Sequence, residues 1–372
     1  MKYLLLALLA ACSFQPRAAG TNGIDAPGAT IDAAGCHTFS SQTDTCGLGS
    51  GAADLTLSGS NSYDTDTGEL NGSAAPHMTF TGQAGPIDVL VVHDFHMTLA
   101  ATLRATGGKP FGVIATGSII LDGMTLIDVS VGGAGARDSC PNAAVAGPDH
   151  DGGAGGGGGG GFGGTGGQGG SGDSDGTATA GGAGGAAAAD PQGPIGGCPG
   201  AQGGAGDNNG GNGGIAGGAV YLAAQTRITL AASAAINAGG GGGDGGGAGG
   251  TFNNGDAGGG GGGTGGIIWL DSPQIRSMGT LAANGGAGGQ GSGDNVTGRA
   301  GSNALVSAMP APGGKGGSST GTDGGAGGAG TLAAQSVLDI DQGGGGGGGG
   351  AVGFIIVRSP DAQLAVVSPP KR

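Results

Sequence analysis

Basic residues are scarce in this 372-residue chain. Lysine and arginine total 12 against 26 aspartates and glutamates, which leaves a formal net charge of −14. No stretch carries enough positive charge to neutralise a run of phosphates, so we expect no nucleic-acid partner. The same deficit disfavours attraction to anionic lipid surfaces. Acidity of this kind promotes solubility without identifying a partner.

Long apolar runs are also missing. Beyond the N-terminal residues no stretch reaches the ~18–20 apolar residues that a membrane-spanning helix needs. Charged residues make up only 10% of the chain and apolar residues 36%. Disordered chains usually combine low hydrophobicity with high net charge, and half of that signature is absent here.

Glycine is what the chain has in abundance, at 102 of 372 residues, and much of it falls into Gly-Gly-X triplets, most clearly between Phe162 and Ser171. A period of three is neither the 3.6 of an α-helix nor the 2.0 of a strand. It is the period of the polyproline-II helix, in which every X side chain lies on one edge and the other two edges are bare backbone. Collagen is excluded, because its strict Gly-X-Y pattern with abundant proline is missing.

A single triplet helix should not be ordered, since fixing one backbone residue costs about 1–2 kcal/mol and glycine is at the expensive end. Side by side, bare glycine edges allow N–H···O bonds between neighbouring segments, each worth about 0.5–1.5 kcal/mol net. Two outcomes remain open at this point. The arrays form polyglycine-II layers clamped at their ends, or they are mobile coils.

Short apolar segments between the arrays resemble one another, as in residues 218–222, 266–270 and 350–354. Their β-branched and aromatic content indicates strands. Strands that recur as units predict an all-β fold of the parallel β-helix (solenoid) type, with a β-sandwich carrying Gly-rich loops as the alternative. The expected parts are a signal peptide at 1–12, a linker at 13–23, the first part of the β-helix at 24–135, a Gly-rich insertion at 136–217, later strands with Gly-Gly-X insertions at 218–367, and a tail at 368–372.

The first twelve residues have the features of an export signal. Lys2 supplies the positive charge, Tyr3–Leu9 the apolar stretch, and small residues precede Cys12. The run Leu9-Ala10-Ala11-Cys12 resembles the lipobox of bacterial lipoproteins, which implies a lipid anchor on Cys12. In that family a serine such as Ser13 goes with outer-membrane retention. We therefore expect an exported protein, lipid-anchored at the outer membrane or cell surface.

Four cysteines remain besides Cys12, an even number that suits an oxidising compartment. Four cysteines allow three pairings. Cys36–Cys46 would close a short loop, and Cys140–Cys198 would close off a Gly-rich block, with a stabilisation of roughly 4 kcal/mol in the chain-entropy model.

The Gly-Gly-X pattern over roughly residues 132–350 resembles the repeats of mycobacterial PE-PGRS surface proteins. It also resembles the polyglycine-II sandwiches of phage-tip adhesins and antifreeze proteins, and the chain as a whole resembles Gly-rich exported bacterial lipoproteins. A PE-type N-terminal helical domain is not recognisable. The resemblance implies surface display and contact through repeats, and it supplies no catalytic residues.

Two polar clusters are candidates for metal binding. His93 and His96 flank Asp94 and Phe95, but on a strand the two imidazoles point to opposite faces, and no third ligand lies nearby. Asp64–Glu69 resembles the start of a calcium loop but lacks the later ligands. We interpret both clusters as turns and expect no metal or other cofactor.

A β-helix also raises the possibility of a carbohydrate-active enzyme, a polysaccharide lyase or hydrolase. Such enzymes need paired carboxylates or a metal together with Arg or Lys. The available acids have few basic residues near them: Asp88, Asp94, Asp122 and Asp128. We therefore favour a non-catalytic structural or adhesive protein of the cell surface and keep the enzyme as the alternative. Polar side chains at the X positions of the triplets recur at regular steps along one edge, which suits a repetitive partner such as a glycan.

Overall fold

The computed structural model describes residues 38–48, 53–173, 176–248, 256–338, 340–341 and 343–372. These residues belong to one compact unit, Thr38–Arg372. The expected signal peptide, the linker at 13–23, Cys12 and Cys36 lie outside the described residues. In the described part all regular structure is β, and no helix there could cross a membrane.

A large sheet of 12 strands forms one wall of the fold. Eleven of its strands follow one another in a single order, and the twelfth, β20, pairs with β17. In spatial order the strands are β1 (Leu55–Leu57), β7 (Phe95–Met97), β10 (Ser118–Leu121), β14 (Arg227–Leu230), β17 (Gln274–Ala282), β15 (Ala235–Asn237), β11 (Leu126–Asp128), β8 (Thr102–Thr106), β2 (Ser60–Asp64), β3 (Glu69–Leu70) and β4 (Ser73–Ala74), with β20 (Asp361–Ser368) beside β17.

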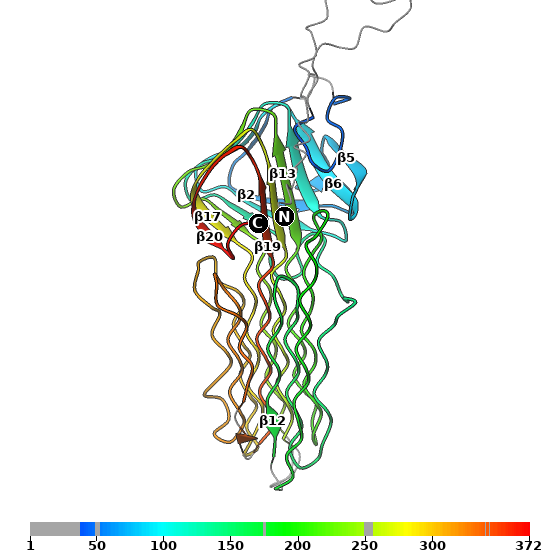
Figure 1. The fold of residues 1–372 in the computed structure, drawn as a ribbon, viewed down its shortest axis with the longest axis vertical. Helices are drawn as coiled ribbons and strands as arrows, with labels where there is room; N and C mark the ends of the chain where they lie inside the picture. The colour runs from blue at the N-terminus through cyan, green and yellow to red at the C-terminus, as the bar shows by residue number, and fades with distance from the viewer. Residues whose placement is uncertain (1–37, 49–52, 174–175, 249–255, 339, 342) are drawn as a thin grey trace, which may run out of the picture. The chain divides into compact units, whose positions relative to one another are not determined.

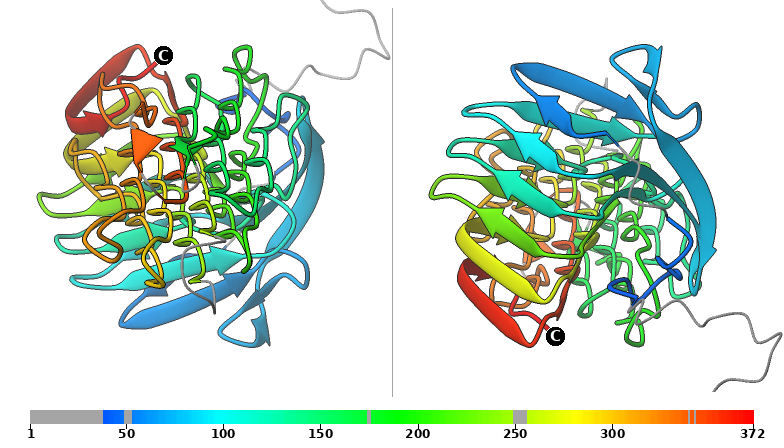
Figure 2. Two further views of the ribbon diagram at one scale, coloured as in Figure 1. Left: turned by 90° about the horizontal axis from the view of Figure 1, so that it is seen from below. Right: turned by 90° about the horizontal axis from the view of Figure 1, so that it is seen from above.

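A second sheet of six strands faces the first. Its order is β19 (Phe354–Arg358), β16 (Ile267–Asp271), β13 (Ala219–Ala224), β9 (Phe111–Ala115), β6 (Gly85–Val92) and β5 (His77–Gly82). A further pair, β12 (Ser171–Gly172) and β18 (Ile340–Asp341), lies far from both sheets (Figure 1). Figure 2 shows the long strands stacked one upon another when the fold is seen from above.

The prediction of a parallel β-helix is wrong. The two sheets mix parallel with antiparallel pairs, because β2, β3 and β4 pair antiparallel, as do β5 and β6. Turn chemistry explains the difference. Asn71 and Gly72 join β3 to β4 with φ values of 53° and 73°, which is the left-handed backbone of a two-residue hairpin turn. A connection this short cannot return a strand in the parallel direction.

The main core lies between the two sheets. Alternate residues of the large sheet point into it, among them Met97, Leu121 and Leu230, and they meet Val113 and Leu222 of the six-stranded sheet. The other face of the six-stranded sheet is covered as well, by side chains that include Phe39, Ile195 and Phe162. Burial on both faces explains why the inner strands β9, β13 and β16 are nearly continuous apolar runs, whereas β5 at the edge is mostly exposed and is not.

Candidate functional site

The glycine-rich segments form an ordered bundle that runs lengthwise from the sheets (Figure 1). We call this the glycine bundle. It comprises the described parts of residues 142–217, 238–265 and 283–353. Its segments are extended, lie side by side in the end-on view of Figure 2, and are joined by backbone N–H···O bonds of about 2.7–3.1 Å. The backbone polar groups of neighbouring segments thus satisfy one another.

Uninterrupted glycine marks the centre of the bundle. Residues 154–162, 257–265 and 343–351 are buried almost throughout and contain the longest glycine runs. Residues 154–162 are hydrogen-bonded to six other segments: 142–149, 164–172, 179–188, 196–206, 256–265 and 343–353. The bonds recur every third residue, as Gly157 N–H to the Gly259 carbonyl and Gly160 N–H to the Gly262 carbonyl show, both at 2.9 Å.

Steric exclusion explains the absence of side chains at the centre. A Cβ added to Gly159 would overlap the backbone carbonyl of Gly349, and one added to Gly156 would overlap that of Gly346. Neither obstacle is a flexible side chain, so the contact cannot be relieved by a rotamer change. The runs with neighbours on every edge, residues 155–161, 258–263 and 343–350, are therefore restricted to glycine.

Gly-Gly-X segments lie on the outside, with one edge facing solvent. The exposed X side chains include Thr165, Gln168, Ala183, Asn209 and Asn212. Four exposed polar residues on adjacent outer segments form what we call the polar row: Gln202, Asn212, Asp244 and Asn303. Asn212 Nδ2 donates to Asp244 Oδ2 at 3.0 Å, and Asn303 Oδ1 accepts the Gly242 N–H at 2.9 Å. These bonds hold the side chains in fixed positions.

One array departs from this rule. The X residues Asn284, Ala287 and Gln290 are buried, at 0%, 0% and 1% exposure. Gln290 Nε2 donates to the carbonyls of Ser318 and Gly321 at 3.0 and 3.2 Å, and its Oε1 accepts the Gly317 N–H at 2.9 Å. The Gln290 side chain thus makes hydrogen bonds to the neighbouring segment that backbone groups make elsewhere in the bundle. The triplet pattern alone does not reveal that this X position is buried.

A disulfide and an aromatic cluster lie where the bundle packs against the six-stranded sheet. Cys140 and Cys198 are bonded, which selects one of the pairings left open by the sequence. Phe162 packs edge-on against Phe354 of β19 with ring centroids 4.9 Å apart, and the Arg137 guanidinium lies over the Phe162 ring at 4.9 Å. Burial lowers the pKa of Arg137, whose Nε donates to the Gly196 carbonyl at 2.8 Å.

The turn predicted over the two histidines is confirmed at His93 and Asp94, which lie between β6 and β7, but is wrong at His96, which lies on β7. His93 Nδ1 lies 2.8 Å from Asp54 Oδ1, and His96 Nε2 lies 3.0 Å from Asp122 Oδ2. The hydrogen bond with His93 lowers the pKa of Asp54 and raises that of His93. Asp54 was missed from the sequence, because it lies 39 residues away and no local pattern links it to His93.

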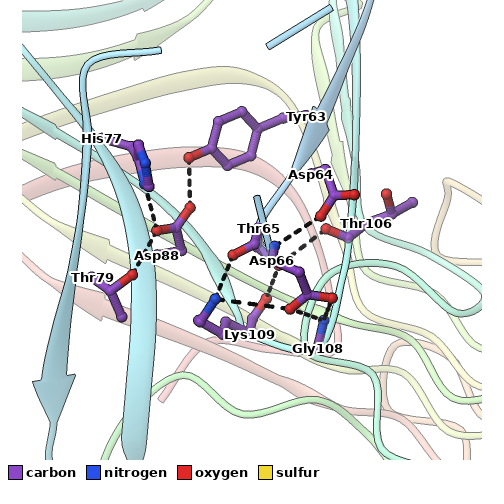
Figure 3. A network of polar contacts seen from close by, with 10 residues as sticks. All are labelled: Tyr63, Asp64, Thr65, Asp66, His77, Thr79, Asp88, Thr106, Gly108 and Lys109. Atoms are coloured by element: carbon purple, nitrogen blue, oxygen red, sulfur yellow. Dashed lines mark hydrogen bonds and ion pairs between the residues drawn. The ribbon is translucent and has the colours of Figure 1, made fainter. Parts of the chain in front are cut away.

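The calcium-like run Asp64–Glu69 forms a turn stabilised by its own side chains. Asp64 Oδ1 accepts the Asp66 N–H at 2.8 Å, and the Asp66 carboxylate accepts the Gly108 N–H at 3.0 Å (Figure 3). Lys109 Nζ lies 3.8 Å from Asp66 Oδ1 and donates to the Thr65 carbonyl at 2.8 Å. The carboxylates serve as acceptors within the turn.

Asp88 is the most buried of the candidate catalytic acids. Its carboxylate accepts hydrogen bonds from Tyr63 Oη at 2.5 Å and Thr79 Oγ1 at 2.9 Å, and His77 Nδ1 lies 2.9 Å away (Figure 3). Burial, together with this carboxylate, raises the pKa of Tyr63. Three partners from β2 and β5 surround the carboxylate on β6, so the cluster ties three strands together.

The other candidate acids also have partners within the fold. Asp128 pairs with Arg104 at 2.7 Å, and Asp94 Oδ1 accepts the Ser118 N–H at 2.6 Å. Two surface hollows, of about 320 and 170 Å³, lie at the C-terminal tail beside Phe354 and at Pro110 beside Arg137. Neither hollow is lined by an aspartate or glutamate.

No known family, curated protein or solved structure matches this chain, so the assignment of function depends on the geometry above.

Proposed function

We propose that this protein is a non-catalytic structural or adhesive protein of the cell surface that makes repetitive contacts through its glycine bundle. The observation that supports this best is the division between all-glycine segments inside and Gly-Gly-X segments outside. Such a bundle is a stiff body, because each buried segment is bonded to several others. Only its outer X side chains are available for contact with a partner.

The polar row suits a partner with regularly placed hydroxyl groups, such as a glycan. The four members of the row lie on four neighbouring segments that are joined by backbone hydrogen bonds, so the packing of the segments sets the intervals between these side chains. Amide and carboxylate groups supply both donors and acceptors to a hydroxyl. Asn212, Asp244 and Asn303 need little ordering on binding, because their side chains are already hydrogen-bonded in the bundle.

The test is binding of the full-length chain to insoluble polysaccharides such as cellulose, chitin and peptidoglycan. The triple variant Gln202→Ala, Asn212→Ala and Asn303→Ala should bind at least about tenfold more weakly, because each lost hydrogen bond is worth about 0.5–1.5 kcal/mol. The control is Thr165→Ala with Gln168→Ala, on an outer segment elsewhere on the bundle. No binding by the unaltered chain, or equal loss in both variants, would contradict the glycan proposal.

Attachment to the outer membrane through Cys12 forms part of the same proposal. Mass spectrometry of the membrane fraction should find a diacylglyceryl adduct on Cys12, and Cys12→Ser should release the protein. An unmodified, cleaved N-terminus would contradict the lipid anchor. The glycan proposal would then depend on the polysaccharide-binding experiment alone.

A further inference from the structure

Three ligand-bearing side chains meet where β1 and β7 begin. These strands pair in parallel with Leu55 opposite Phe95, which places the preceding residues Asp54 and Asp94 side by side. The alignment is fixed by backbone bonds on both sides, from the His93 N–H to the Ala53 carbonyl at 3.1 Å and from the Leu55 N–H to the Asp94 carbonyl at 2.8 Å. The sheet register therefore assembles the cluster.

We propose that Asp54, His93 and Asp94 form a binding site for a divalent transition-metal ion of the Zn²⁺ type. His93 Nδ1 lies 2.8 Å from Asp54 Oδ1 and 3.6 Å from Asp94 Oδ2, and one ligand atom of each residue lies within 4.8 Å of the others. Ligands that each lie about 2.0–2.2 Å from one zinc ion in tetrahedral geometry are separated by about 3.3 Å. The observed separations require only small side-chain movements to reach that value.

The orientation of the carboxylates supports this site. Asp94 Oδ1 accepts the Ser118 N–H at 2.6 Å, which leaves Asp94 Oδ2 directed toward His93. Asp54 Oδ1 also accepts the Asp94 N–H at 3.2 Å. Hydrogen bonds of this kind, which hold ligating carboxylates in place, are the usual support around protein-bound metals.

The donor set determines the class of ion. One imidazole and two carboxylates provide a nitrogen and at least two oxygens, with a charge of −2 when the imidazole is neutral. Imidazole nitrogen favours zinc and its first-row neighbours over calcium and magnesium, which prefer oxygen ligands alone. The side chains of His93, Asp54 and Asp94 are 49%, 65% and 41% exposed. Solvent can therefore supply the remaining ligands, as in sites that keep an open position.

A second histidine–aspartate pair, three residues further along the chain, serves as a control for the proposed metal site. His96 lies 3.0 Å from Asp122 and is similarly exposed, at 38%. This pair belongs to no described cluster of three such groups within mutual reach. If a histidine–aspartate pair sufficed for binding, the two places would be equivalent. If the third ligand is required, only the cluster at His93 will bind.

Calorimetric titration of the full-length chain with ZnCl₂, and separately with CaCl₂, tests the proposal. We expect saturable zinc binding that His93→Asn and Asp54→Asn each weaken at least about tenfold, no change in His96→Asn, and no comparable binding of calcium. ¹⁵N spectra of labelled histidines should show the His93 Nδ1 signal shifting with zinc while that of His96 stays in place.

Two results would overturn the site. One is an absence of zinc binding by the unaltered chain. The other is binding that persists unchanged in both His93→Asn and Asp54→Asn. The histidine spectra of the unaltered chain keep the test decisive if either variant folds poorly, because they locate zinc without any substitution.

Discussion

The two sheets and the glycine bundle bury their residues by opposite means. In the sheets, large side chains such as Leu222 and Ile268 fill the space between strands, and their burial from water supplies the stabilisation. In the centre of the bundle the glycine runs have no side chains, and neighbouring backbones are in direct contact through hydrogen bonds. The chain changes from one mode to the other at Gly266, where a buried glycine segment continues directly as β16.

This difference shows that glycine, which usually makes a chain flexible, can also form a packed interior when neighbouring backbones are hydrogen-bonded to one another. An ordered glycine costs more conformational entropy than any other residue, so a buried glycine run persists only where its amides and carbonyls are bonded on several sides. The sheets should tolerate side-chain changes that conserve volume. The centre of the bundle should tolerate none, because its neighbours are backbone atoms that cannot rotate away.

The largest expected effect comes from removing the disulfide where the bundle packs against the six-stranded sheet. The Cys140–Cys198 bond spans 58 residues, and in the chain-entropy model closing such a loop contributes about 4 kcal/mol. The double variant Cys140→Ser and Cys198→Ser should lose about that much stability in urea unfolding, with the bundle melting before the sheets. A single transition at the original midpoint would contradict the expected contribution of the bond.

Adding one methyl group inside the bundle should have the next largest effect. Gly159→Ala should cost about 3 kcal/mol or more, because the new Cβ overlaps the Gly349 carbonyl. The matched control is Gly164→Ala, whose Cβ would meet only the Ala351 Cβ at 3.9 Å. Chemical denaturation of both variants checks the difference, and equal stabilities would refute the steric account of the bundle.

Removing one methylene from the sheets should cost less. Ile268 is fully buried between the sheets, and Ile268→Val should destabilise by about 1 kcal/mol. The comparison predicts that one carbon matters more in the bundle than in the core. A larger loss for Ile268→Val than for Gly159→Ala, measured under the same conditions, would reverse that ranking.

The last expected effect depends on pH and concerns a single carboxyl group of the bundle. Burial, reinforced by the charges of Asp294 and Asp207, raises the pKa of Asp256 from 3.8 to about 6. The folded chain therefore binds this proton more tightly than the unfolded chain, so its contribution to stability decreases as pH rises from about 4 to about 6. Asp256→Asn should remove that decrease, as the difference between unfolding curves across this range will show. An identical pH profile in the variant would contradict the raised pKa.

The sequence was sufficient for some features and not for others. Short apolar runs predicted β13 and β16 in the right places. Of the two outcomes that the sequence left open for the Gly-Gly-X arrays, the hydrogen bonds of the bundle show the packed one. The β-helix was wrong because the hairpin turn at Asn71–Gly72 was overlooked. The partner of His93 could not be found, since sheet register alone brings Asp54 beside it.

The third repeat was placed in the wrong register. We compared residues 350–354 with 266–270, whereas Ile267 pairs with Phe354, so Gly266 corresponds to Gly353. The error is three residues, one full triplet. The apolar run 354–357 matches residues 267–270 at every position, whereas the comparison with 350–354 places Gly353 opposite Trp269, so the sequence held the information and the comparison overlooked it.

Hydrogen exchange of the full-length chain labelled with ¹⁵N-glycine tests the central claim most directly. If buried backbones hold one another in the bundle, the amides of residues 155–161 and 258–263 will exchange as slowly as those of the sheets, over hours rather than seconds. Gly176 and Gly316, on exposed turns, will exchange fast. Rapid exchange throughout the glycine runs, with the sheets still protected, would show that the bundle is not a packed structure.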